Sequence, residues 1–201
     1  MIRLSNAFLS ILKPCLLVSC RLNFIIKMEN KLLEVIKTRR SCRSFKPEQL
    51  TDEELTAVLE AGTYAPTSRG MQSPYIVAVQ NEALRRVLGE MNARIMGTNS
   101  NPYYDAPTYI LVFAPEKANN PVQDASLVLE NMMLAAHALG LGSCWIHRER
   151  EMFASEEGQK LMDEWGLPVG LMGVGALAIG YPADMPGQTK SRKADYYRII
   201  R

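Results

Sequence analysis

The chain has 201 residues, of which 47% are hydrophobic and 22% are charged, and its formal net charge is +2 at pH 7. This length supports one well-buried core, and the composition excludes both a disordered and a fibrous protein. Near-balanced charge argues against nucleic acid as a partner, because proteins that bind it usually carry a strongly basic face.

Residues 1–27 differ from the rest of the chain. They are basic and apolar, without an amphipathic stripe that could pack on a core. The apolar run before Cys20 is similar to a lipoprotein signal, but Lys13 and Pro14 interrupt it and the segment is too short to span a membrane. Met28 opens a polar, helix-forming stretch. We therefore interpret residues 1–27 as a leader or a non-native extension, and residues 28–201 as one domain.

The cysteine pattern contains no C-x-x-C pair and no matching histidine spacing, which argues against a zinc site and against a disulfide framework. The four cysteines are Cys15, Cys20, Cys42 and Cys144. We expect a reducing compartment, the cytoplasm, with no membrane partner. Cys144 lies in an apolar stretch, which indicates an inert buried thiol.

The first half of the chain carries clear helix and loop signals. Apolar spacing predicts a helix over residues 29–38, followed by a cationic segment. Thr51 and Glu54 form the pattern of a capping box, which predicts a helix that runs to Ala61, before Gly62. Two prolines and a glycine in residues 65–74 predict an exposed, structured loop, of the kind that often carries a site.

The second half alternates between strands and helices. We predict strands over residues 75–80 and 109–114 and a helix over residues 82–91. Residues 124–139 are apolar nearly all round, which predicts a helix buried in the core or in a dimer interface, with His137 packed in the core and Gly140 as C-cap. Residues 141–146 and 171–179 return to extended structure.

Two basic clusters occur at opposite ends of the globular part of the chain. One holds Arg39, Arg40 and Arg43 around Ser41, and the other holds Lys190 and Arg192 around Ser191. Together they suggest one phosphate pocket, because a phosphate dianion is bound by charge-assisted donors and arginine matches its oxygens.

Other common sites leave no trace in the sequence. There is no P-loop sequence and no dinucleotide-binding G-x-G-x-x-G between a strand and a helix. Only two histidines are present, without a nucleophile elbow or a cluster of metal-binding residues, so neither a catalytic triad nor a metal site is expected.

Over residues 29–201 the chain resembles the nitroreductase superfamily of FMN-dependent NAD(P)H oxidoreductases. Each matching segment is short, but their joint order and spacing are specific. The segments are residues 39–45, 65–68 with Gln72, 105–107, 130–136, 139–146, 180–182 and 190–192.

The resemblance implies an α+β fold, a three-layer sandwich in which a mostly antiparallel sheet is flanked by helices. Two chains would intertwine as a homodimer with one FMN in each of two interface clefts. The residues implied to bind FMN are Arg39, Arg40, Ser41, Arg43, Lys190 and Arg192 at the phosphate and ribitol, Pro66, Thr67, Ser68 and Gln72 from the other subunit, and Ile146 and His147 over the ring.

The activity implied is ping-pong transfer of hydride from NAD(P)H, as co-substrate, through the flavin to a nitroaromatic, a quinone or a similar small organic acceptor. No side chain is expected to act as acid or base, because the cofactor carries the chemistry and the protein orients it. The sequence leaves open the physiological acceptor and the choice between NADH and NADPH.

Three departures from the family pattern fall on the acceptor side of the flavin. Gly70 stands where asparagine is common, residues 73–75 replace Pro-Trp, and His147 with Arg148 replaces a glycine. One hypothesis makes His147 a titratable donor near the substrate; the other leaves it facing solvent.

Two rival functions remain at this stage. A flavin-binding protein with a flavin-handling or biosynthetic role, without NAD(P)H turnover, would share the same fold. A nucleic-acid contact through the basic tail and the arginine loop is disfavoured by the charge balance and by the lack of a known binding module.

Overall fold

The computed structural model describes residues 31–184 and 187–201. The chain divides after Thr38 into two units, which are considered separately. In the first, residues 31–38 are helical, as predicted for this part of the segment. The leader interpreted in residues 1–27 lies outside the described residues. No helix in the described ranges is long and apolar enough to cross a membrane.

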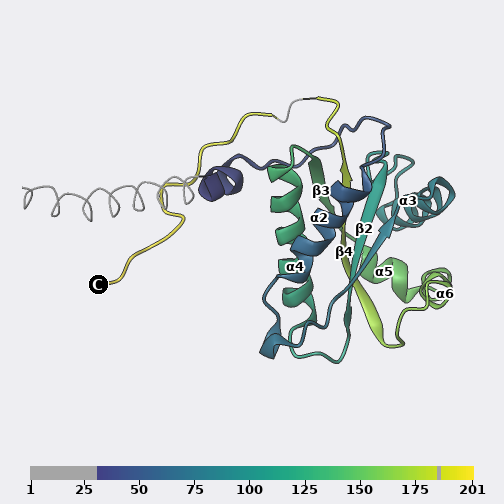
Figure 1. Cartoon of the computed structure of the whole chain (residues 1–201). Coiled ribbons are helices and arrows are strands. Elements are labelled where there is room, and N and C mark those ends of the chain that lie inside the picture. The colour runs from purple at the N-terminus through teal and green to yellow at the C-terminus, as the bar shows by residue number, and fades with distance from the viewer. Residues whose placement is uncertain (1–30, 185–186) are drawn as a thin grey trace, which may run out of the picture. The chain divides into compact units, whose positions relative to one another are not determined.

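The second unit is built on a four-stranded sheet within the described residues, with the strand order β1-β2-β4-β3 (Figure 1). The strands are β1 (Tyr75–Val79), β2 (Thr108–Pro115), β3 (Gly142–Ile146) and β4 (Leu171–Gly180). Every pairing is antiparallel. The two central strands are buried almost throughout, which explains why they read as continuous apolar runs.

Helices cover both faces of this sheet. Successive side chains of a strand point to opposite faces, so Leu111 and Phe113 of β2 enter one core and Ile110 and Val112 enter the other. The helices are α2 (Asp52–Thr63) and α4 (Pro121–Ala138) over one face, and α3 (Glu82–Met96), α5 (Glu149–Ala154) and α6 (Glu156–Glu164) over the other (Figure 1). The predicted α+β, three-layer fold is confirmed.

Helix α2 begins as predicted and ends later. Thr51 Oγ1 accepts a hydrogen bond from the Glu54 N–H at 3.2 Å, and Glu54 Oε2 accepts one from the Thr51 N–H at 3.0 Å. The predicted end before Gly62 is wrong, because the helix continues to Thr63. A Cβ at Gly62 would lie 2.9 Å from Met132 Cγ, so this glycine serves the close packing of α2 on α4.

Other boundaries differ from the predictions by a few residues. Helix α3 continues beyond residue 91 to Met96, where Gly97 adopts a left-handed conformation (φ 70°). Helix α4 starts at Pro121, and its C-cap is Leu139, with Gly140 following at φ 79°. The short helices α5 and α6 were not predicted.

Strand β4 contacts the start of α5 so closely that only glycine fits at residue 173. A Cβ there would lie 2.4 Å from the carbonyl oxygen of Glu149 and 2.7 Å from its carbonyl carbon. Backbone cannot rotate out of the way as a side chain can.

We expect Gly173→Ala to lower the free energy of unfolding by about 1–3 kcal/mol, measured by urea denaturation. Gly187→Ala is the control, since nothing lies within 4 Å of its Cβ position; equal midpoints for the two variants would contradict this packing.

Candidate flavin site

Residues 39–43 lie along the outer edge of β3. Ser41 forms a parallel bridge with Ser143, and the Cys42 N–H donates to the Ser143 carbonyl at 2.9 Å. The contact is close, because a Cβ at Gly142 would lie 2.7 Å from Cys42 Sγ. Pairing with the sheet therefore fixes the backbone from which the predicted phosphate-binding arginines project.

Arg39 presents an unusual unpaired group. Its Nη1 is buried and has no hydrogen-bond partner in the described part of the chain. Arg40 lies beside it and donates through Nη1 to the Arg39 carbonyl. Leaving a charged donor buried and unpaired is unfavourable, so this nitrogen is suited to an anionic ligand. The arginine pair thus fits the phosphate of a flavin mononucleotide.

The field of this pair reaches the end of α4. The pKa of His137 is lowered by burial and, to a smaller extent, by the charges of Arg39 and Arg40. His137 was predicted to pack in the core, but it is only half-buried. The neutral form of His137 is favoured next to two cations, so the positive charge of the cluster comes from the arginines.

Arg43 extends the cationic segment toward the loop before β2. Its Nε donates to Tyr104 Oη at 3.2 Å, and its guanidinium carbon lies 5.8 Å from the centre of the tyrosine ring. The hydrogen bond raises the pKa of Arg43. Nearby Cys144 is a free, buried thiol, as predicted, and burial raises its pKa.

A cavity of about 340 Å³ opens at the far end of β3; we call it the β3 cavity. Its lining includes Met96, Ser100, Tyr104, Trp145, His147 and Arg148. Ile146 and His147, both predicted to lie over the flavin ring, are at this end of the strand; Ile146 is buried and His147 is exposed. The cavity therefore adjoins the predicted ring position.

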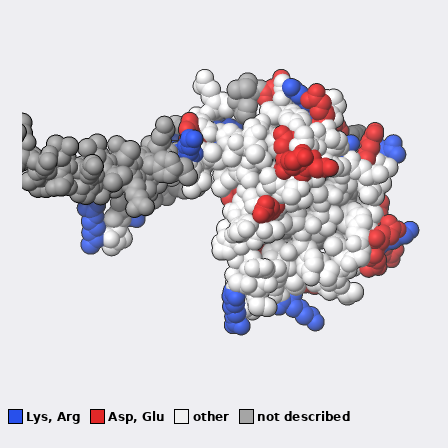
Figure 2. All heavy atoms as spheres, viewed as in Figure 1, with Lys and Arg blue, Asp and Glu red and all other residues white. Residues whose placement is uncertain are grey.

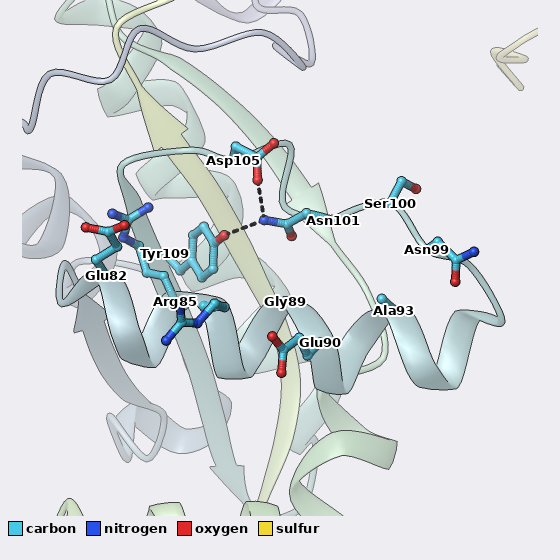
Figure 3. A pocket seen from close by; sticks show the side chains of 11 residues that line it. Glu82, Arg85, Gly89, Glu90, Ala93, Asn99, Ser100, Asn101, Asp105 and Tyr109 are labelled. Atoms are coloured by element: carbon cyan, nitrogen blue, oxygen red, sulfur yellow. Dashed lines mark hydrogen bonds between the residues drawn. The ribbon is translucent and has the colours of Figure 1, made fainter.

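One wall of the β3 cavity is the loop before β2, and Asn101 holds it (Figure 3). Its Nδ2 donates to Asp105 Oδ1 at 2.8 Å and to Tyr109 Oη at 3.0 Å, while its Oδ1 accepts from the Tyr103 N–H at 3.0 Å. A Cβ at Gly89 would lie 2.9 Å from Asn101 Oδ1, so the glycine gives this side chain its space over α3. These hydrogen bonds tie the loop to β2 through Tyr109.

The pocket drawn in Figure 3, of about 400 Å³, lies on the other side of that loop. Its lining mixes acidic and basic side chains. Its most enclosed cation, Arg85, already donates to the carbonyls of Gln80 and Ala106, at 3.2 and 2.9 Å. We therefore ascribe to Arg85 a structural role and do not assign a ligand to this pocket.

Behind the β3 cavity is a buried polar network. Asn92 Nδ2 donates to the His147 carbonyl at 2.8 Å, and Arg148 Nη1 donates to Asn92 Oδ1 at 3.4 Å. Tyr103 Oη donates to Glu149 Oε1 at 2.8 Å, whereas Glu149 Oε2 has no partner among the described residues. Burial raises the pKa of Glu149 to about 8, against the lowering effect of the Tyr103 hydrogen bond. Glu149 is thus largely neutral at pH 7.

The second predicted part of the site, the loop of residues 65–72, is fastened to the start of α4. Asp124 accepts hydrogen bonds from the Ser68 N–H and hydroxyl, and Asn120 Nδ2 donates to Ser68 Oγ at 2.7 Å. Thr67 Oγ1 accepts from the Gln72 N–H at 2.9 Å, and Pro66 is exposed. The sequence prediction missed Asp124, whose signal is a carboxylate in the first turn of a largely apolar helix.

The two parts of the predicted site are far apart within one chain. The loop is tied to Asp124 near the start of α4, and the arginine pair acts on His137 near its end. At 1.5 Å per residue, the helix between these positions is about 20 Å long. The structure therefore brings Ser41 to β3 and Arg43 to Tyr104 of the cavity wall, but it does not bring Thr67 and Ser68 to them.

Among the described residues, Lys190 and Arg192 form no contact with either group that would place them in the site. They are exposed, outside any helix or strand, and make no hydrogen bond or ion pair within the described ranges. Their contribution to the phosphate site remains a prediction.

Comparisons with known proteins agree with this geometry. The model of the nitroreductase family matches residues 36–103 and 92–181. An Archaeoglobus fulgidus protein with the provisional name NADH dehydrogenase/NAD(P)H nitroreductase is 32% identical over 158 residues, 76% of this chain and 86% of the relative. An FMN reductase (NADPH) of Bacillus subtilis is 27% identical over 182 residues, 79% of this chain and 69% of the relative.

A solved structure points the same way. The Bacteroides fragilis nitroreductase with bound FMN superposes with a TM-score of 0.77 at 31% identity, over 85% of this chain and 98% of that one. The chain belongs to the nitroreductase family.

The raised pKa of Glu149 predicts a pH-dependent stability. Between its ordinary pKa of 4.5 and about 8, the folded protein retains a proton that the unfolded chain releases, so the free energy of unfolding falls as pH rises through this range and levels off above it. Relative to Glu149→Gln, the wild type should lose on the order of a few kcal/mol between pH 5 and pH 8, measured by urea denaturation. The exposed neighbour Glu151→Gln is the control and should keep the wild-type slope. A Glu149→Gln variant with the same slope would contradict the assignment.

Proposed function

We propose that this protein is an FMN-dependent oxidoreductase that transfers hydride from NAD(P)H to a nitroaromatic, a quinone or a similar small organic acceptor. The observation that carries the proposal is the buried, unpaired Nη1 of Arg39 at the edge of β3. Arg39 lies in a cationic segment that pairs with β3, and the far end of β3 lines a cavity. The chain belongs to a family whose solved members include FMN-bound nitroreductases.

In this proposal each residue group has a binding role. Arg39, Arg40 and Arg43 hold the phosphate, with the hydroxyl of Ser41 and the tail cations Lys190 and Arg192. Ile146 and His147 lie against the ring, and the β3 cavity receives the donor and then the acceptor. Bound FMN supplies the hydride chemistry, and the side chains bind and orient the reactants.

The proposal includes a homodimer in which each site is shared. The loop of residues 65–72 is tied to Asp124, and the arginine pair acts on His137, about 20 Å further along α4. In this proposal Pro66, Thr67, Ser68 and Gln72 therefore complete the site of the partner protomer. Exposed apolar side chains support an interface: Tyr64, Met71 and Leu127 are 77%, 70% and 43% exposed. On the face viewed in Figure 2, acidic side chains gather in the upper part, and a broad surface below them carries few charged side chains.

We also place the protein in the cytoplasm. Cys42 and Cys144, the two cysteines in the described part of the chain, are free thiols, which suits a reducing compartment.

The deciding experiment is an absorption spectrum of the purified protein, followed by anaerobic addition of NADH and then NADPH. Flavin bands that bleach with either nucleotide are the expected result. A colourless protein that takes up no FMN would overturn the proposal. Bound flavin that neither nucleotide bleaches would favour the alternative, a flavin-handling protein without NAD(P)H turnover.

Arg39 should dominate binding of the flavin phosphate. A charge-assisted hydrogen bond contributes about 1.5–3 kcal/mol, so Arg39→Ala should raise the Kd for FMN by about 10- to 100-fold, measured by quenching of FMN fluorescence on titration of the apoprotein. Arg86→Ala removes an exposed arginine of α3 and should leave the Kd unchanged. Equal affinities for the two variants would place the phosphate elsewhere.

Sharing of sites between protomers can be tested by complementation. Arg39→Ala impairs the phosphate cluster and Asp124→Ala releases the loop of residues 65–72, so each homodimer should bind FMN weakly. A heterodimer isolated through two different tags contains one site with both defects and one with neither, and should regain about half of the FMN of the wild type. Arg39→Ala paired with Arg43→Ala should regain nothing. Weak binding in both heterodimers would refute a shared site.

A further inference from the structure

Arg148 is a cation without an acidic partner in a substrate-sized cavity. It is half-buried, and the hydrogen bond that positions its guanidinium is the 3.4 Å contact with the neutral Asn92 amide. No carboxylate lies within 4.0 Å of it in the described part of the chain. The residues that line the β3 cavity include no aspartate or glutamate.

The groups around the cavity do not neutralise this charge. Asp105 is turned to Asn101 and lines the pocket on the other side of the loop. Glu149, the next residue in the chain, is fully buried, and burial favours its neutral form more strongly than the Tyr103 hydrogen bond and the charge of Arg148 favour the carboxylate. Arg43 contacts Tyr104 from outside and adds a second positive charge near the same wall. The β3 cavity is therefore electropositive.

The backbone at Arg148 is strained. Its φ is 88°, a left-handed value that glycine adopts freely and that a long side chain rarely does. Asn92 holds both the carbonyl of His147 and the guanidinium of Arg148, so the strain and the direction of the side chain are fixed together. Strained, over-determined residues concentrate at functional sites.

We propose that Arg148 determines specificity by binding an anionic group, a carboxylate or a phosphate, of the molecule that occupies the β3 cavity. This inference rests on the proposed function and names the substrate class that the site prefers. The group belongs either to the acceptor or to the nicotinamide donor. This anionic group is distinct from the flavin phosphate. The segment of Arg39 pairs in parallel with the beginning of β3, whereas Arg148 follows the end of that strand.

The test compares variants that keep or remove the charge. Arg148→Asn removes it with a residue that tolerates a left-handed backbone, and Arg148→Lys keeps it. Arg150→Asn is the matched control, because it removes an equal charge from an exposed position of α5. Each holoprotein is assayed for kcat/KM with 4-nitrobenzoate and the neutral 4-nitrobenzyl alcohol, and for the rate of anaerobic bleaching by NADPH and NADH.

We expect Arg148→Asn to lower either kcat/KM for 4-nitrobenzoate or the rate of bleaching by the nucleotides at least tenfold. Arg148→Lys should lose less, and Arg150→Asn should lose nothing. A loss confined to 4-nitrobenzoate assigns the anionic group to the acceptor; a loss confined to bleaching assigns it to a phosphate of the donor. Unchanged behaviour in both arms overturns the inference.

A binding measurement separates this inference from the proposed function. Calorimetric titration of the purified protein, as isolated, with benzoate and benzyl alcohol needs no turnover. Benzoate should bind at least tenfold more weakly to Arg148→Asn than to Arg150→Asn. Wild-type protein that binds no flavin would refute the proposed function, while the benzoate titration would still decide the role of Arg148.

Discussion

The candidate site depends on the pairing of residues 41 and 42 with the outer edge of β3. An edge strand exposes unpaired peptide groups, and this segment satisfies some of them through the Cys42 hydrogen bond to Ser143. Gly142 leaves room for Cys42. One backbone contact therefore brings a cationic segment to the strand that leads into the β3 cavity. The proposed phosphate site and the proposed substrate cavity thus share β3 as their support.

Helix α4 sets the scale of the proposed dimer. Its first turn holds the loop of residues 65–72 through Asp124, a carboxylate at the positive end of the helix dipole. Its last turn faces the arginine pair. Because helix α4 lies between them, the loop and the arginine pair are separated within one chain, as the proposed shared site requires. The nearly uniform apolar character of this helix suits an element that packs on the sheet and also lies beside an exposed apolar surface.

Local patterns predicted much of the fold. The capping box at Thr51, the buried run of β2 and the proline-rich loop need only neighbouring residues to be recognised. Gly62 was wrongly predicted to follow the end of the helix. This position requires glycine because Met132, distant in sequence, packs against it. The sequence marked Arg148 as a departure from the family pattern, but it did not indicate the contacts of Arg148 or Glu149, because their partners Asn92 and Tyr103 are 56 and 46 residues away.

The amide of Asn101 has a further consequence for how the protein ages. Asparagine converts spontaneously to aspartate when the backbone nitrogen of the next residue attacks the side-chain amide and forms a cyclic imide. The next residue is Pro102, whose nitrogen carries no hydrogen, so this route is blocked. The side chain that ties Asp105, Tyr109 and the Tyr103 backbone together is thus protected from deamidation by this route, which would replace its hydrogen-bond donor by a carboxylate.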